Sequence, residues 1–111
     1  MNISIDTTGM FPVARLSGDF GLDDGDQLLE QLQPLVAEAG SRLAIVLEDV
    51  TFINSSGLNA LIALGTRARL SQGRLVLVAP SKFVRGVLEV TQLDGWFEIR
   101  DDLEAAGQEL A

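Results

Sequence analysis

Two short apolar stretches open the chain and predict a pair of neighbouring strands. Ile3 and Ile5 alternate with polar residues, and after a turn at residues 8–9 a second apolar stretch covers residues 11–16. The polar stretch over residues 17–26 contains three glycines and four aspartates. This composition predicts a loop that leads from the second strand into a helix.

The first helix is predicted from apolar residues that recur at the spacing of an amphipathic helix packed on a sheet. These residues are Leu28, Leu32, Leu35, Val36 and Ala39. Pro34 lies inside this stripe, where its missing N–H predicts a kink or a break in the helix. Gly40 is expected to end the helix, because glycine adopts the left-handed backbone conformation that follows many helices.

Two continuous apolar runs predict strands that are buried on both faces. Residues 43–47 and 75–79 are apolar without alternation, as expected of strands inside a parallel sheet. Between them, apolar residues at helical spacing predict a helix from about Ser55 to Ser71, ended by Gly73. Such a strand, helix and strand are typical of a right-handed parallel crossover.

The last third of the chain predicts two further helices around one short strand. The first of these helices begins at Ser81 and is followed by a turn at residues 94–95 and a strand over residues 96–99. The second begins at Asp101, whose spacing from Glu104 is that of a capping box. The residues expected to face inward are Phe83, Val84, Val87 and Leu88 in one helix, and Leu103, Ala106 and Leu110 in the other.

The predicted order of elements is β-β-α-β-α-β-α-β-α, in a single domain over residues 1–111. This order predicts an α/β fold with a mixed, mostly parallel sheet of four to five strands and about four helices packed against it. Functional loops of such sheets lie at the carboxyl ends of the strands. The segments 18–26, 48–57 and 79–82 are therefore the first places to look for a site.

Composition and charge narrow the function classes. The 111 residues include 16 acidic and 8 basic side chains, for a net charge of −8, and they include no His and no Cys. Ser-His-Asp and Cys-His catalysis, thiolate metal sites and disulfides are therefore excluded. The negative charge disfavours direct binding to nucleic acid and favours a protein partner with a basic surface. Because no apolar run approaches the roughly 18 residues that span a bilayer and the first residues do not resemble a signal peptide, we expect no membrane insertion and a cytoplasmic location.

The acidic residues that follow the second strand do not match a calcium loop. Counted from Asp19, the EF-hand spacing places Gly21 at the third position and Asp24 where glycine is required. We interpret these carboxylates as favourable charges at a helix N-terminus. A receiver-type phosphoacceptor at Asp49 is also excluded, because residues 7–9 lack the acidic pair that it needs. We therefore expect no metal ion, no cofactor and no enzymatic activity.

The segment Asn54-Ser55-Ser56-Gly57 joins the third strand to the second long helix, and it has two interpretations. Each of the first three residues can cap a helix through a side-chain oxygen, so an ordinary N-cap is one of them. One cap needs only one such residue, however. A hydroxyl beside it would lie at the positive end of the helix dipole, where a phosphate is well tolerated. The second interpretation is therefore a phosphorylation switch on a docking surface.

The sequence resembles the STAS domain family and, within it, the stand-alone anti-sigma-factor antagonists of bacteria. The segment Leu47–Leu58 is similar to the family's Asp-Ser-Ser/Thr-Gly-Leu signature. The other similar segments are Leu16–Phe20, Arg74–Ala79, Val87–Leu93 and Trp96–Ile99. Together they cover essentially the whole chain.

The resemblance implies a partner-switching mechanism. Such antagonists, when unphosphorylated, bind an anti-sigma factor that has a histidine-kinase-like ATP-binding fold and serine kinase activity, and so release the sigma factor. Phosphorylation of the first serine of the signature, here Ser55, ends the binding, and a PP2C-type serine phosphatase reverses it. The implied partner-binding residues are Asp19, Phe20, Gly21, Asn54, Ser55, Ser56, Gly57 and Asn59.

At two of these positions the chain departs from the family pattern, because Asn54 and Gly21 stand where Asp is common. Both departures lower the negative charge near Ser55. Two other hypotheses stay open. A cytosolic STAS subunit of a lipid/ABC transporter complex would dock through the same surface without phosphorylation. A metabolic enzyme of the same fold class would need a catalytic constellation that the sequence does not contain.

Overall fold

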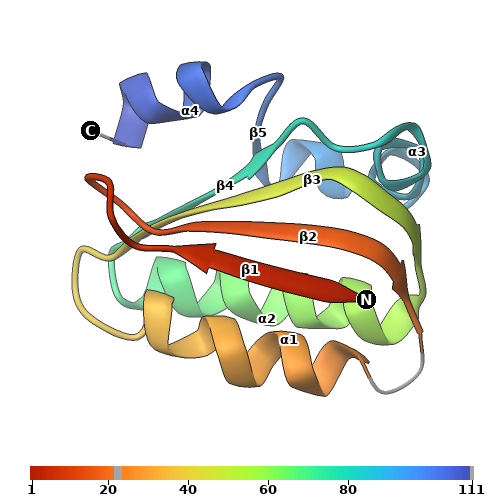
Figure 1. Cartoon of the computed structure of the whole chain (residues 1–111), viewed down its shortest axis with the longest axis horizontal. Helices are drawn as coiled ribbons and strands as arrows, with labels where there is room; N and C mark the ends of the chain where they lie inside the picture. The colour runs from red at the N-terminus through yellow and green to blue at the C-terminus, as the bar shows by residue number, and fades with distance from the viewer. Residues whose placement is uncertain (22–23, 111) are drawn as a thin grey trace.

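A five-stranded sheet organises the chain, with its strands side by side in the order β1-β2-β3-β4-β5 (Figure 1). The computed structural model describes residues 1–21 and 24–110. Its strands are β1 (Asn2–Asp6), β2 (Val13–Phe20), β3 (Arg42–Ile53), β4 (Arg74–Val78) and β5 (Glu98–Arg100). β1 is antiparallel to β2, and every other neighbouring pair is parallel. The predicted mixed, mostly parallel sheet is confirmed.

Helices cover both faces of the sheet, in the predicted order. In Figure 1, α1 and α2 lie side by side below the sheet, whereas α4 lies above it and α3 lies beside the far end of β3. The helices are α1 (Asp24–Leu32), α2 (Ser55–Leu70), α3 (Lys82–Val90) and α4 (Leu103–Leu110), with single 3-10 turns η1 (Gln33–Val36) and η2 (Leu93–Gly95). Among the described residues, no helix is long and apolar enough to cross a membrane.

Side chains on the two faces of β3 and β4 form two separate hydrophobic clusters, which explains why both strands are continuously apolar. The larger cluster, on the side of α1 and α2, includes Leu43, Ile45, Leu47, Leu75 and Leu77. The smaller cluster, on the side of α4, includes Ala44, Val46, Val76 and Val78 with Ala106 and Leu110. Full burial of one such leucine or valine side chain stabilises the fold by about 1.5–3 kcal/mol.

Several helix ends agree with the sequence, and others are shifted. Pro34 lies at the start of η1, so the predicted break in the helix is confirmed. Gly40 has a positive φ of 72° but does not end the helix as expected, because η1 ends at Val36 with Ala37 as its C-cap. After α2 the left-handed residue is Gln72, with a φ of 58°, rather than Gly73. Gly73 is needed for a different reason, because a Cβ there would lie 2.4 Å from the Ser41 carbonyl oxygen.

Two expectations about the last elements are wrong. The final helix begins at Leu103, and its first turn is capped by Asp102, which accepts a hydrogen bond from the Ala105 amide at 2.7 Å. Asp101 therefore is not the cap. The last strand begins at Glu98 rather than at residue 96. The backbone of Trp96 and Phe97 turns back on η2 instead, since both amides donate to the Leu93 carbonyl oxygen.

The strands β2 and β3 are longer than predicted, and this places the candidate site. Residues 17–20 and 48–53 were expected in loops, but they continue the parallel ladder from the pair Ser17 and Asp49 to the pair Phe20 and Ile53. One register shift lies just before this stretch, between Arg15 and Ser17, and a second lies within it, between Gly18 and Asp19. Such irregularities place an extra residue on one strand and change the direction of nearby side chains, and the backbone pairing resumes beyond them. The polar residues for which loops were predicted therefore belong to the paired ends of β2 and β3.

Candidate functional site

Asn54 caps the N-terminus of α2. Its side-chain oxygen accepts a hydrogen bond from the Gly57 amide at 3.0 Å, and its backbone is extended, as at most N-caps. Its own amide donates to the Phe20 carbonyl oxygen at 3.1 Å, which fixes the cap against the end of β2. The ordinary cap expected somewhere in this segment is therefore Asn54, and neither serine is required for it.

The two serines that follow Asn54 are not equivalent. Ser55, the first residue of α2, is exposed, whereas Ser56 is partly buried against α1. A Cβ added to Gly25 of α1 would lie 2.5 Å from the Ser56 hydroxyl oxygen and 2.6 Å from the Ser56 carbonyl oxygen. The glycine at position 25 thus allows α1 to press on Ser56. Of the two hydroxyls, the one on Ser55 is presented to solvent.

The first turn of α2 packs on buried side chains at the ends of β2 and β3. Phe20 is fully buried and Ile53 nearly so. A Cβ added to Gly57 would lie 2.7 Å from Ile53 Cγ1 and 3.4 Å from Phe20 Cβ, so glycine lets the first turn of α2 descend onto the strand ends. Phe20 was expected to contact a partner. Its burial makes it a support for that surface instead.

Asp19 is held in place by a residue that the sequence analysis did not single out. The Thr51 hydroxyl donates a hydrogen bond to Asp19 Oδ1 across the β2–β3 pair, and both side chains are exposed. Gly21 is partly buried, and its amide donates to Asp24 Oδ2 at 2.6 Å at the start of α1. The contact of Asp19 with Thr51 could have been predicted only if the two strands had been expected to pair as far as these residues.

These residues share one end of the molecule, where β2 and β3 end and α2 begins (Figure 1). We call this set the Ser55 surface: its exposed or partly exposed members are Asp19, Gly21, Asn54, Ser55, Ser56 and Asn59. Asn59 is exposed one helical turn after Ser55. The predicted location at the carboxyl ends of the strands agrees with this geometry.

An exposed aromatic pair adjoins the Ser55 surface. The ring centroids of Phe52 and Phe83 are 5.3 Å apart with a 42° angle between the rings, and each residue is about 40% exposed, at 42% and 41%. Phe83 was expected to face the core, and this expectation is wrong. The core contacts of α3 are made by Val84 and Leu88, which are almost fully buried, and by Val87, which packs partly against the same core as expected.

Ser81 fixes α3, and with it Phe83, against β3. The Ser81 hydroxyl donates to the Val50 carbonyl oxygen at 2.6 Å and also accepts a hydrogen bond from the Val84 amide at 3.3 Å. The Ser81 amide donates to the Leu47 carbonyl oxygen at 3.2 Å. A single residue therefore caps α3 and ties it to two points of the neighbouring strand, so that the aromatic pair is held beside the end of β3.

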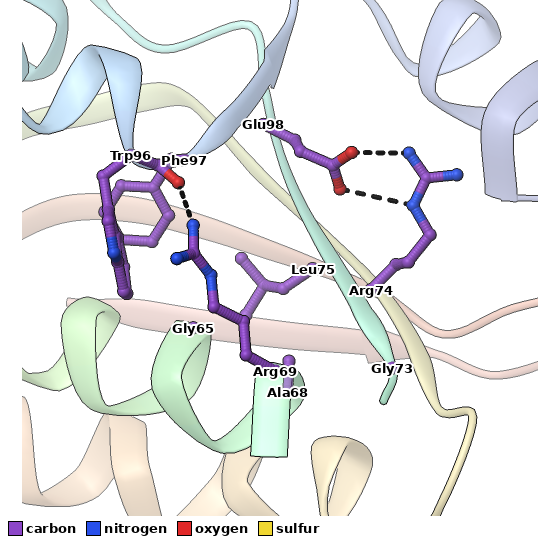
Figure 2. A pocket seen from close by; sticks show the side chains of 9 residues that line it. All are labelled: Gly65, Ala68, Arg69, Gly73, Arg74, Leu75, Trp96, Phe97 and Glu98. Atoms are coloured by element: carbon purple, nitrogen blue, oxygen red, sulfur yellow. Dashed lines mark hydrogen bonds and ion pairs between the residues drawn. The ribbon is translucent and has the colours of Figure 1, made fainter. Parts of the chain in front are cut away.

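A cavity of about 260 Å³ lies away from the Ser55 surface, between the second half of α2, the start of β4 and the segment before β5 (Figure 2). Its charged groups are already paired. Arg74 forms an ion pair of 2.6 Å with Glu98, and the Arg69 guanidinium lies 4.2 Å from the centroid of the Trp96 ring and donates to the Trp96 carbonyl oxygen. We interpret these contacts as structural, because the Arg69 contacts join α2 to the segment before β5 and the Arg74–Glu98 pair joins β4 to β5.

Ion pairs also fasten α4 to the sheet. Glu109 pairs with Arg100 at 2.5 Å and with Arg74 at 3.2 Å, while Arg42 donates to the Leu110 carbonyl oxygen. The hydrogen bond from Arg100 lowers the pKa of Glu109, and the reciprocal hydrogen bond raises the pKa of Arg100. Within residues 1–21 and 24–110, no group of three or more acidic side chains is arranged to hold a metal ion.

Comparison with known proteins identifies the family. A family model described as "Mlab, STAS domain" matches residues 3–103, which is nearly the whole chain. The chain belongs to the STAS domain family. This membership confirms the resemblance found in the sequence, and the five-stranded mixed sheet with four helices is the fold of this family.

Similar proteins are named as anti-sigma factor antagonists. BtrV of Bordetella bronchiseptica, which is provisionally named as one, is 27% identical over 106 residues, covering 96% of this chain and 91% of BtrV. A crystal structure from Mycobacterium paratuberculosis has a TM-score of 0.85 at 24% identity, covering 98% of this chain and 92% of the other. The phosphorylated form of SpoIIAA from Bacillus has a TM-score of 0.75 at 18% identity, covering 99% and 100%. The two structures show the same fold.

Proposed function

We propose that the protein is an anti-sigma-factor antagonist that is switched off by phosphorylation of Ser55. The observation that supports this most directly is the division of roles at the start of α2. Asn54 caps the helix, Ser56 packs on α1, and Ser55 is left exposed at the helix N-terminus. Unphosphorylated protein binds an anti-sigma factor with serine kinase activity, and a PP2C-type phosphatase restores this form. The chain itself acts by binding and carries out no reaction.

The chemistry of the switch follows from this geometry. The partner kinase transfers the γ-phosphoryl group of ATP to the Ser55 oxygen, so a new P–O bond forms as the bond to ADP breaks and the hydroxyl proton leaves. The phosphate adds about −1.5 to −2 charges. At the positive end of the α2 dipole this charge is tolerated by the fold. A phosphate forced into a closed interface without a cationic partner costs several kcal/mol, which is enough to end a micromolar complex.

The relatives support the same proposal. BtrV, which matches over most of its length, is provisionally named as an anti-sigma factor antagonist, and the fold is shared with a SpoIIAA structure in its phosphorylated form. The net charge of −8 favours a partner with a basic docking surface. Asn54 is neutral, so a kinase with its bound ATP meets less negative charge here than at a site with Asp.

A second candidate function is a docking subunit of a lipid/ABC transporter complex. It is supported by the completeness of the Asn54 cap, because the Ser55 surface is formed without any modification. In that case the same surface would contact an ATPase permanently, and Ser55 would stay unphosphorylated. The two functions differ in which protein binds and in the covalent state of Ser55.

The experiment that tests the proposal is affinity purification of the chain from its host, followed by mass spectrometry of the partners and of the intact chain. We expect a small ATP-binding kinase that, once purified, adds one phosphate to the wild-type chain and to Ser56→Ala but none to Ser55→Ala. The Ser56→Ala variant is the matched control, because it removes the neighbouring hydroxyl. Recovery of a transport ATPase with unmodified chain would contradict the proposal and favour the second candidate.

A further inference from the structure

An apolar strip lies on the exposed side of α3, and of its residues Val87 also packs partly against the hydrophobic core. Phe83, Gly86, Val87, Val90 and Thr91 line a shallow groove, and we call this set the α3 strip. Val90 is 86% exposed, and Phe83 is 41% exposed. A valine and a phenylalanine are thus exposed to water along the same helix, and apolar side chains that cluster on a surface mark a candidate binding site.

The spacing of the strip shows that it is a second apolar face of α3. The helix packs on the core through Val84 and Leu88, which are 1% and 0% exposed. Phe83, Val87 and Val90 recur at i, i+4 and i+7, so they form a stripe that borders the buried one, with Val87 packed partly against the core. A Cβ at Gly86 would meet no atom within 4 Å. The groove is therefore open at its centre, where it could admit a side chain from another molecule.

The α3 strip and the Ser55 surface meet at Phe52. This residue lies near the end of β3, three positions before Ser55, and its ring packs on Phe83 at a centroid distance of 5.3 Å. Ser81 holds the two elements together through the Val50 carbonyl oxygen. One partner that covers Ser55 can therefore reach the strip without crossing a gap in the surface.

We infer that the α3 strip is the apolar half of the docking surface and receives a bulky apolar side chain, flanked by Lys or Arg, from the same protein that covers Ser55. This inference rests on the proposed function. A few buried anchor residues supply most of the binding energy in protein interfaces, whereas charged groups at the rim contribute mainly to specificity and association rate. The Ser55 surface then acts as the switch, and the α3 strip supplies affinity.

Charge distinguishes this occupant from other apolar ones. A second copy of the chain would bring another net charge of −8 to the interface, and an anionic lipid surface would also be repelled. Glu89, next to Val90, is exposed, as are Asp49 on the neighbouring strand β3 and Asp19 on the Ser55 surface. Lys82 is the basic residue adjacent to Phe83, whereas Arg85 pairs with Asp101 at 3.6 Å. A partner with basic side chains around its apolar anchor fits these carboxylates.

The test compares two exposed aliphatic residues at different places. Val90→Ser removes the end of the strip, and Leu70→Ser removes a residue that is 75% exposed at the opposite end of α2 from Ser55. Neither change touches the core, so both variants should unfold as the wild type does. The affinity of each is measured by calorimetry against the purified anti-sigma-factor kinase recovered with the wild-type chain. Phe83→Ala is measured in the same way.

We expect Val90→Ser and Phe83→Ala to weaken binding by about tenfold or more, as for truncation of interface anchors, and Leu70→Ser to bind as the wild type does. Equal affinity of Val90→Ser and the wild type would overturn the inference, as would an equal loss with Leu70→Ser. A wild-type dimer in sedimentation that Val90→Ser dissociates would assign the strip to a second copy. Binding to phosphatidylglycerol vesicles that Val90→Ser abolishes would assign it to lipid, and either result overturns the inference.

Failure of the proposed function gives a different pattern. If the wild-type chain recovers a transport ATPase and no kinase, the function proposed above is wrong. The same three variants are then measured against that ATPase, and a loss confined to Val90→Ser and Phe83→Ala still supports an apolar anchor in the strip. If the wild-type chain binds neither protein, both proposals are overturned.

Discussion

The Asn54 side-chain oxygen accepts a hydrogen bond from the Gly57 amide at 3.0 Å. Because this contact caps α2, the Ser55 side chain is not needed as the cap. Three consecutive residues could each have capped the helix. Because the first of them does so, the hydroxyl of the second is available for chemistry while the fold stays unchanged. The switch and the stability of the helix are therefore separable by mutation.

The first prediction follows from this separation. Asn54→Ala should lower the free energy of unfolding by about 1 kcal/mol, because the Gly57 amide loses its acceptor, while Asn54→Asp should keep it. Ser55→Ala should leave it unchanged within about 0.5 kcal/mol, as is usual for an exposed position. Urea unfolding followed by circular dichroism measures all three. A larger loss with Ser55→Ala than with Asn54→Ala would show that the serine is the real cap.

The second prediction concerns the close approach of α1 to α2. Gly25→Ala should destabilise the protein by about 1–3 kcal/mol, because its Cβ would lie 2.6 Å from the Ser56 carbonyl oxygen and the two helices would have to separate. Gly86→Ala is the matched control, since its Cβ would meet no atom within 4 Å. Because Gly86 lies inside a helix, its replacement by alanine should raise the free energy of unfolding by about 0.5–1 kcal/mol. Thermal unfolding of both variants checks the opposite signs.

The third prediction is a pH dependence of the contact between α4 and the sheet. The hydrogen bond from Arg100 lowers the pKa of Glu109 below its ordinary value of 4.5, so ionised Glu109 stabilises the folded state. This stabilisation is fully present above pH 4.5 and is lost as the pH falls through the lower folded value. The wild type should therefore have a higher melting temperature than Glu109→Gln at pH 7, and this difference in melting temperature should shrink as the pH is lowered.

The control for this pH dependence is Glu104→Gln on the exposed side of the same helix. It removes an equal charge without removing a partner of Arg100. If Glu104→Gln and Glu109→Gln gave the same difference from wild type at every pH, net charge rather than the ion pair would explain the effect.

The fourth prediction concerns Asp19 and Thr51. Thr51→Val keeps the shape of the side chain but removes the hydroxyl that donates to Asp19. Both residues are exposed, so the loss of stability should be at most about 1 kcal/mol, whereas the orientation of Asp19 on the Ser55 surface should be lost. In a double-mutant cycle with Asp19→Asn, the two changes should weaken partner binding by less than the sum of their separate effects. Strict additivity would show that the contact does not position Asp19.

Much of the fold was predictable because apolar spacing reports which faces are buried. Continuous apolar runs correctly predicted that β3 and β4 are buried on both faces. The break in the first helix was predicted correctly from Pro34. Residues 17–20 and 48–53 were predicted as loops because polar side chains dominate them. Their backbones pair all the same, since a ladder between neighbouring strands does not require apolar side chains.

The candidate site was predictable in place but not in detail. The junction of Asn54, Ser55 and Ser56 follows from the sequence, yet the different exposure of the two serines depends on how closely α1 approaches at Gly25. Phe83 was assigned to the core because it belongs to the apolar side of the predicted helix. Helical spacing identifies that side, but it does not show how much of it the sheet covers. The core covers Val84 and Leu88 almost completely and Val87 in part, and it leaves Phe83 exposed.

The most direct test of the central claim is the affinity of the purified anti-sigma-factor kinase for the chain in its two covalent states. Unphosphorylated chain should bind, and chain phosphorylated at Ser55 should bind at least about 100-fold more weakly, while both forms melt at nearly the same temperature. Ser55→Asp should imitate the phosphorylated form in direction. Equal affinity of the kinase for the two forms would contradict the assignment of Ser55 as the switch.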